Sequence, residues 1–156
     1  SVNNIKSLVL GGHGDSMVAM VNHTEVNGKK LRDIVNSGNL SQVKLDNIID
    51  RTKKGGAEIV KFLEKGSAFY APASSGIEMA ESYLKDLRKQ LPCAAYLNGE
   101  YGVKDIYAGV PVIIGKNGVE KVIELELDKL EKDNFLKSIE SVKELFTAAK
   151  KIDQNL

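Results

Sequence analysis

The sequence has few of the residues from which disulfides and metal sites are built. Its 156 residues include one cysteine, two histidines and no tryptophan. A single cysteine cannot form an internal disulfide, which suits a reducing compartment. His13 could pair with Asp15 or His23 around a metal, but the sequence contains neither a His-Glu-x-x-His segment nor a cysteine pair. We therefore expect no metal cofactor.

The chain also lacks a large excess of positive or negative charge, because 22 lysines and arginines nearly cancel 21 acidic residues and leave a net charge of +1. Without a strong field, neither nucleic acid nor an anionic membrane is an expected partner. The first four residues, Ser-Val-Asn-Asn, contain no initiator Met and no basic or apolar signal segment. We expect a cytoplasmic location and a start inside a longer protein.

Several motifs of nucleotide and hydrolase sites are absent as well. The chain contains no Gly-x-Gly-x-x-Gly and no P-loop, so it has no expected glycine-rich cradle for phosphates. Ser16 or Ser74 could be a nucleophile, but neither lies in the Gly-x-Ser-x-Gly elbow of a serine hydrolase.

What is present indicates one soluble α+β domain over residues 1–156, with 42% apolar and 28% charged residues. Strands are predicted from runs of apolar and β-branched residues, and Asn117-Gly118 indicates a hairpin between the last two. The predicted strands span residues 5–10, 17–26, 91–97, 109–114 and 119–125.

Helices are predicted from apolar residues that recur every three or four positions. Ser41 is a suitable N-cap for a long helix that Gly55-Gly56 should interrupt, and Pro72 suits the first turn of the next helix. The predicted helices span residues 31–36, 41–65, 72–90 and 129–152. We expect Ile77, Tyr83 and Leu84 to face inward, and both phenylalanines of the last helix to lie in the core. The fold expected is α+β, with antiparallel sheets packed against long helices.

His13 is the residue most suited to chemistry. It lies among Gly11, Gly12 and Gly14, whose missing side chains would let a ligand approach. An imidazole titrates near neutrality and can accept or release a proton. The alternative is a histidine that only makes a backbone hydrogen bond in a glycine turn, and His23 is expected to be an ordinary surface strand residue.

Residues 9–18, Val-Leu-Gly-Gly-His-Gly-Asp-Ser-Met-Val, resemble the active-site histidine segment of the lactate/malate dehydrogenase family. Further matches span nearly the whole chain, at residues 55–60, 66–73, 92–96 and 99–103. Together they are similar to the second half of the lactate-dehydrogenase-like malate dehydrogenases of bacteria. The fold implied is that family's C-terminal, substrate-side domain.

The resemblance implies that His13 moves the hydroxyl proton of a 2-hydroxy acid while NAD exchanges a hydride with it. It places Gly12 and Gly14 beside this histidine, and Ser67 and Ala68 near substrate and nicotinamide, where small side chains leave room for a dicarboxylate. Ser67 and Ala68 could instead belong to a helix-entry segment with a packing role. The family's orienting aspartate and substrate-binding arginines precede the histidine and so fall before Ser1.

We therefore expect the C-terminal domain of an NAD-dependent enzyme that converts malate to oxaloacetate, with lactate as the alternative substrate. The N-terminal dinucleotide-binding domain is absent from these 156 residues, so the isolated chain should be inactive. A homo-oligomer, dimer or tetramer, is implied by the family. A non-catalytic folding or oligomerisation module is the rival hypothesis; the enzyme needs His13 at an open, polar concavity, whereas the module allows it to be buried.

Overall fold

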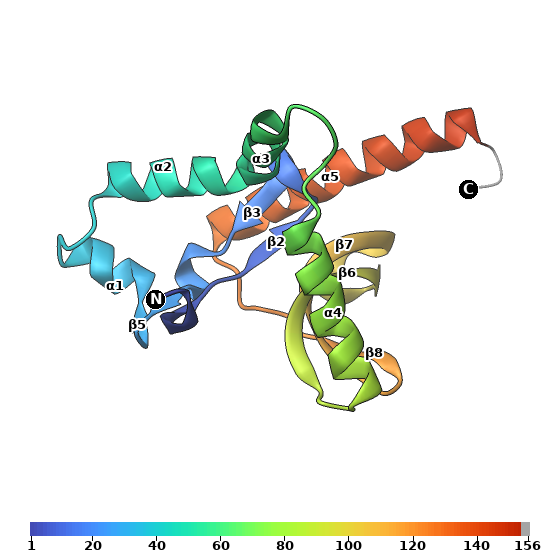
Figure 1. Cartoon of the computed structure of the whole chain (residues 1–156), viewed down its shortest axis with the longest axis horizontal. Helices are drawn as coiled ribbons and strands as arrows, with labels where there is room; N and C mark the ends of the chain where they lie inside the picture. Colours follow the sequence, from blue (N-terminus) through green and yellow to red (C-terminus); the bar gives the residue numbers. More distant parts are fainter. Residues whose placement is uncertain (154–156) are drawn as a thin grey trace.

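The computed structural model describes residues 1–153. In Figure 1, α4 lies in front of β6 and β7, and α5 passes behind β2 and β3. The strands are β1 (Ile5–Lys6), β2 (Val9–Gly11), β3 (Met17–Ala19), β4 (Glu25–Val26), β5 (Lys29–Lys30), β6 (Lys89–Asn98), β7 (Lys104–Gly115) and β8 (Gly118–Val122). The helices are α1 (Leu31–Asn36), α2 (Gln42–Lys53), α3 (Gly55–Leu63), α4 (Tyr70–Leu84) and α5 (Lys129–Ile152).

All strand pairs are antiparallel, as predicted. A five-stranded sheet has the order β3-β2-β7-β6, with β8 also paired to β7, and β1, β4 and β5 form a small second sheet. The β7–β8 hairpin closes at Gly115 and Gly118. Gly118 has a φ of +84°, a conformation that glycine adopts without strain, so the Asn-Gly signal marked a real turn.

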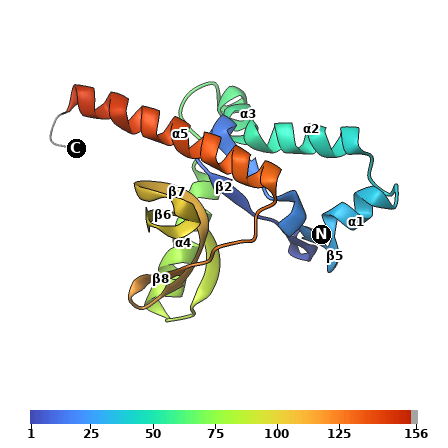
Figure 2. The same cartoon turned by 180° about the vertical axis from the view of Figure 1, so that it is seen from behind.

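The core lies between the five-stranded sheet and α5. Phe135 and Ile139 of α5 are 1% and 2% exposed, and they pack in one cluster with Leu97, Val110 and Val112 of the sheet. Figure 2 shows α5 crossing this face, where it contacts β2 and β3. The expected core position of Phe135 is confirmed.

Reciprocal caps fix the start of α5 at its predicted position. The Asp128 carboxylate accepts a hydrogen bond from the Glu131 N–H at 2.8 Å, and the Glu131 carboxylate accepts one from the Asp128 N–H at 3.2 Å. This capping box satisfies amide groups that the first turn of a helix leaves unpaired. From there α5 runs for 24 residues, and its last turns project beyond the sheet.

The predicted interruption at Gly55-Gly56 is confirmed. Helix α2 begins after Ser41, whose hydroxyl accepts a hydrogen bond from the Lys44 N–H, and it ends at Lys53. Helix α3 begins at Gly55. Arg51 bridges the break with a bidentate pair to Glu58, at 2.9 and 3.0 Å.

Three predicted elements are wrong in extent. Residues 5–10 do not form one strand, because β1 and β2 are separate strands that belong to different sheets. Residues 17–26 do not form one strand, because a 3-10 turn at Val21–His23 separates β3 from β4. Helix α4 ends at Leu84 rather than near residue 90, and Lys89 already belongs to β6. The buried Ser82 hydroxyl donates to the Ile114 carbonyl at 2.6 Å and accepts from the Lys89 N–H at 3.1 Å, which ties the new strand to the helix end.

Several residues expected to face inward are exposed. Ile77, Tyr83 and Leu84 of α4 are 68%, 48% and 78% exposed, and Phe146 of α5 is 43% exposed. The apolar periodicity of these helices is real, but within residues 1–153 nothing buries these faces. In the same range, no helix is long and apolar enough to cross a membrane.

Candidate active site

His13 stands at the tip of the loop that joins β2 to β3. The two strands pair up to Gly11 and Met17, and residues 14–16 form a single 3-10 turn. Gly11 and Gly14 have φ values of +88° and +73°, which explains glycine at both positions. The imidazole is exposed to solvent. The loop therefore presents His13 outward, as a proton-transfer residue requires.

The base of this loop is packed closely against β7. Gly11 pairs directly with Gly109. A Cβ atom at Gly109 would lie 2.8 Å from the Gly11 carbonyl oxygen. Strands β2 and β7 can thus approach at this point because Gly109 has no side chain.

Helix α5 holds the other side of the loop. The Gly12 N–H donates to the Ser138 hydroxyl oxygen at 2.8 Å, and Ser138 is 3% exposed. A Cβ atom at Gly11 would overlap the Ser138 side chain. Within the loop, the Ser16 hydroxyl donates to the His13 carbonyl at 3.4 Å. Sequence reasoning missed Ser138, since a serine on a helix carries no signal of a distant partner.

His13 borders an open hollow of about 420 Å³. Its walls are mostly apolar, including Leu10, Val142 and Leu145, so the described residues make it less polar than the enzyme hypothesis expected. Gly12, Ser16 and Cys93 also line it. Burial raises the pKa of the Cys93 thiol, which donates to the Met79 sulfur at 3.4 Å. Cys93 is therefore a poor nucleophile near neutral pH.

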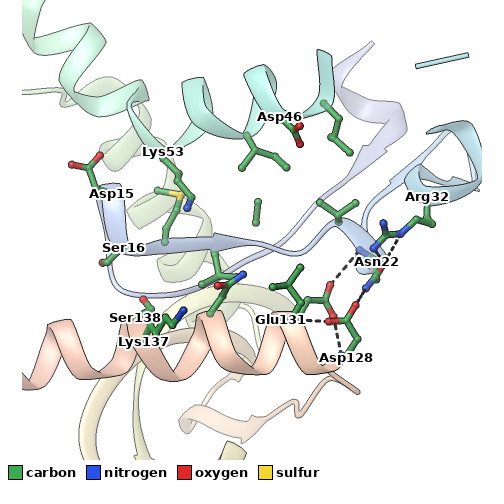
Figure 3. Close-up of a pocket in the computed structure, with 18 of the residues that line it drawn as sticks. Asp15, Ser16, Asn22, Arg32, Asp46, Lys53, Asp128, Glu131, Lys137 and Ser138 are labelled. Atoms are coloured by element: carbon green, nitrogen blue, oxygen red, sulfur yellow. Dashed lines mark hydrogen bonds between the residues drawn. The ribbon is translucent and has the colours of Figure 1, made fainter. Parts of the chain in front are cut away.

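A second cleft of about 420 Å³ lies on the other side of the loop, between α2, β3 and α5 (Figure 3). Ser16 and Met17 line both hollows, so the segment after His13 forms the wall between them. Figure 3 shows Ser138 on α5 pointing toward the strand segment that carries Ser16. The anchored loop thus separates two depressions of the surface.

At the far end of this cleft, Asn22 connects three charged residues. Its side-chain N–H₂ donates to Asp128 at 2.7 Å, its side-chain oxygen accepts from Arg32 at 2.8 and 3.0 Å, and its backbone N–H donates to Glu131 at 3.4 Å (Figure 3). The hydrogen bond from the Glu131 N–H lowers the pKa of Asp128, and Asn22 and Arg32 act in the same direction. These contacts join the 3-10 turn at Val21–His23 to the start of α5.

The remaining candidates do not line the hollow beside His13. Ser67 is exposed and Ala68 half-buried, both between α3 and α4, and neither lines the hollow beside His13. Gly14 has open space around it. His23 lies in a 3-10 turn rather than a strand, and its Nε2 is 3.0 Å from the Glu126 carbonyl oxygen.

The described residues do not fit the phosphates of a dinucleotide. The glycine-rich loop after β2 leads into a three-residue 3-10 turn and then another strand. It therefore lacks the helix N-terminus that binds a pyrophosphate. Residues 1–153 also contain no cluster of three or more His, Cys, Asp or Glu placed to hold a metal ion.

Sequence comparison identifies close relatives. Residues 1–152 match the family described as lactate/malate dehydrogenase, alpha/beta C-terminal domain. The chain is 59% identical to malate dehydrogenase of Pelagibacter ubique, over 99% of the chain and 48% of that protein. It is 57% identical to malate dehydrogenase of Caulobacter vibrioides, over 100% of the chain and 49% of that protein. It thus spans about half the length of these relatives.

Solved structures agree with the sequence match. Malate dehydrogenase of Cryptosporidium parvum superposes with a TM-score of 0.93 at 42% identity, over 97% of this chain and 48% of that one. Lactate dehydrogenase of Eimeria maxima, solved with NADH and oxamate, gives a TM-score of 0.93 at 40% identity, over 99% and 48%. The chain belongs to the lactate/malate dehydrogenase family, whose α/β C-terminal domain it matches almost from end to end.

Proposed function

We propose that this chain is the substrate-side half of an NAD-dependent malate dehydrogenase, and that His13 transfers the hydroxyl proton of the substrate. The observation that carries the proposal is the presentation of His13, exposed at the tip of a glycine loop anchored on two sides. Two curated relatives at 57% and 59% identity are malate dehydrogenases, which favours malate. Lactate is the alternative, since lactate dehydrogenases share the fold.

The proton chemistry follows from the imidazole. In the oxidation of malate, neutral His13 accepts the hydroxyl proton and becomes a cation; in the reduction of oxaloacetate, the cation returns the proton. NAD would supply the hydride acceptor. An imidazole can both accept and donate a proton, so the same side chain can serve both directions of the reaction.

The rest of the site is proposed to come from outside these residues. Among residues 1–153, no lysine or arginine lines the hollow beside His13, so we assign the binding of the substrate carboxylates to cationic partners from elsewhere. The described residues also do not fit the cofactor phosphates. We assign both tasks to the half of the relatives that this chain does not match, and we keep Ser67 and Ala68 as candidate pocket residues next to that half.

A cytoplasmic homo-oligomer, dimer or tetramer, completes the proposal. The exposed apolar side chains of α3 and α4, including Phe62 at 77% and Leu84 at 78%, are more typical of a buried contact than of a free surface. The same feature favours the second candidate, a folding or oligomerisation module without catalysis. His13 separates the two candidates, because only the enzyme needs its imidazole.

The test is a hybrid in which the first half of the Pelagibacter ubique malate dehydrogenase is fused to this chain. Malate-dependent NADH formation is expected from the hybrid and not from the chain alone. His13→Asn should lower kcat by about 10²- to 10⁴-fold, the usual contribution of a general acid or base. His23→Asn, the matched control, should retain activity. A hybrid that is inactive, or that is active with asparagine at position 13, would refute the proposal.

A further inference from the structure

The one side chain of α5 that is hydrogen-bonded to the His13 loop is Ser138, among the hydrogen bonds described for residues 1–153. Its hydroxyl oxygen accepts the Gly12 N–H at 2.8 Å, across a sequence separation of 126 residues. We infer that Ser138 is a positioning residue for His13: it fixes the Gly11–Gly12 peptide, one peptide before the histidine, and so sets where the imidazole meets the substrate. This inference rests on the proposed function of His13.

Ser138 is itself held firmly. It is 3% exposed, and the next residue, Ile139, is 2% exposed in the core cluster together with Phe135 one turn earlier. The hydroxyl therefore projects from a helix whose position is set by the packing of its neighbours. Moving the acceptor would require moving α5 against the sheet, which close packing resists.

The loop fits around this side chain. Ser138 occupies the space that a Cβ atom of Gly11 would need, so the serine contacts the loop as well as bonding to it. Within the sheet, Gly11 is also paired with Gly109 of β7. The loop base is thus enclosed between a strand and a helix, and one peptide separates the hydrogen bond from His13.

The loop needs such an anchor because of its composition. Gly11, Gly12 and Gly14 give the backbone around His13 unusual freedom, and each additional conformation would move the imidazole. Proton transfer requires the imidazole within hydrogen-bond distance of the substrate hydroxyl. A misplacement of about 1 Å can cost about 100-fold in rate. The expected signature is a lower kcat with little change in KM, because the inferred role concerns orientation of the histidine.

The hydrogen bond can be tested directly on the 156-residue chain by amide hydrogen exchange measured by NMR. In the wild-type chain the Gly12 amide should be protected from exchange. Ser138→Ala removes the acceptor and should accelerate Gly12 exchange by about tenfold or more. Ser141→Ala is the matched control on the same helix, since its hydroxyl donates to the Lys137 carbonyl, and it should leave Gly12 unchanged. Equal Gly12 exchange in wild type and Ser138→Ala would overturn the inference.

If Ser138→Ala does not fold, Ser138→Cys keeps nearly the same volume with a weaker acceptor, and intermediate Gly12 protection is expected. In the hybrid enzyme, Ser138→Ala should lower kcat by about 10- to 100-fold with a similar KM, while Ser141→Ala should match wild type. An unchanged kcat would overturn the positioning role. An inactive wild-type hybrid would instead refute the proposed function, and the exchange measurement would still decide whether Ser138 holds the loop.

Discussion

Replacing Gly109 by alanine tests whether the His13 loop depends on a close approach of two strands. A Cβ atom there would lie 2.8 Å from the Gly11 carbonyl oxygen, whereas ordinary contacts begin at 3.4 Å. Strand β2 would have to retreat by about 0.6 Å, the difference between these two distances. On its other edge, Gly109 is paired with Ala94 of β6, so β7 cannot easily yield. We expect destabilisation of about 1–3 kcal/mol, typical of overpacking.

Urea unfolding followed by circular dichroism would measure this loss. With a denaturant slope of about 2 kcal/mol/M, the midpoint should fall by about 0.5–1.5 M. Gly76→Ala is the matched control, because Gly76 lies inside α4 with no neighbouring atom within 4 Å of its added Cβ. Alanine should stabilise that helix by about 0.5–1 kcal/mol. A midpoint for Gly109→Ala equal to or above that of wild type would refute the close-approach argument.

Two further predictions concern α5. Phe135→Ala should destabilise the chain by about 3–5 kcal/mol, because the side chain is 1% exposed and its ring centroid lies 5.1 Å from that of Tyr101. Leu145→Ala, at a residue 71% exposed, should change the urea midpoint little. Equal shifts of the midpoint in the two variants would contradict the assigned core. Asp128→Ala should lower stability at neutral pH by removing the cap of α5. Since folding lowers the pKa of Asp128, its stabilisation is complete above the unfolded pKa of about 4 and is lost as the pH falls from there through the lower pKa of the folded state. The midpoints of wild type and Asp128→Ala should therefore converge in acid, and a constant gap would show that the ionised carboxylate is not responsible.

The elements predicted most accurately are those whose ends depend on nearby residues. Helices α1 and α5 span residues 31–36 and 129–152 as predicted, and Ser41 caps α2. The end of α4 was missed because distant contacts set it: Ser82 bonds to Ile114, 32 residues away. Apolar periodicity correctly identified one-sided faces on α4, but periodicity alone does not say what covers such a face.

In the candidate site, too, local features could be predicted from the sequence and distant contacts could not. The histidine and its glycines were recognisable from a short segment of sequence, since their spacing is local. Ser138 was not, because its partner lies 126 residues earlier. The role of Gly109 was missed as well, because the predicted strand began at this residue. The structure places Gly109 inside β7, where a glycine often marks the close approach of another backbone.

The long span between Gly12 and Ser138 has a consequence for the order in which the domain is made. During synthesis the loop with His13 emerges well before the helix that holds it, and a contact across such a sequence separation is slow to form. A chain interrupted before α5 would contain the histidine without its anchor. Under the inference drawn for Ser138, an incomplete domain could not orient the imidazole, so proton transfer would be reserved for chains whose synthesis has passed α5.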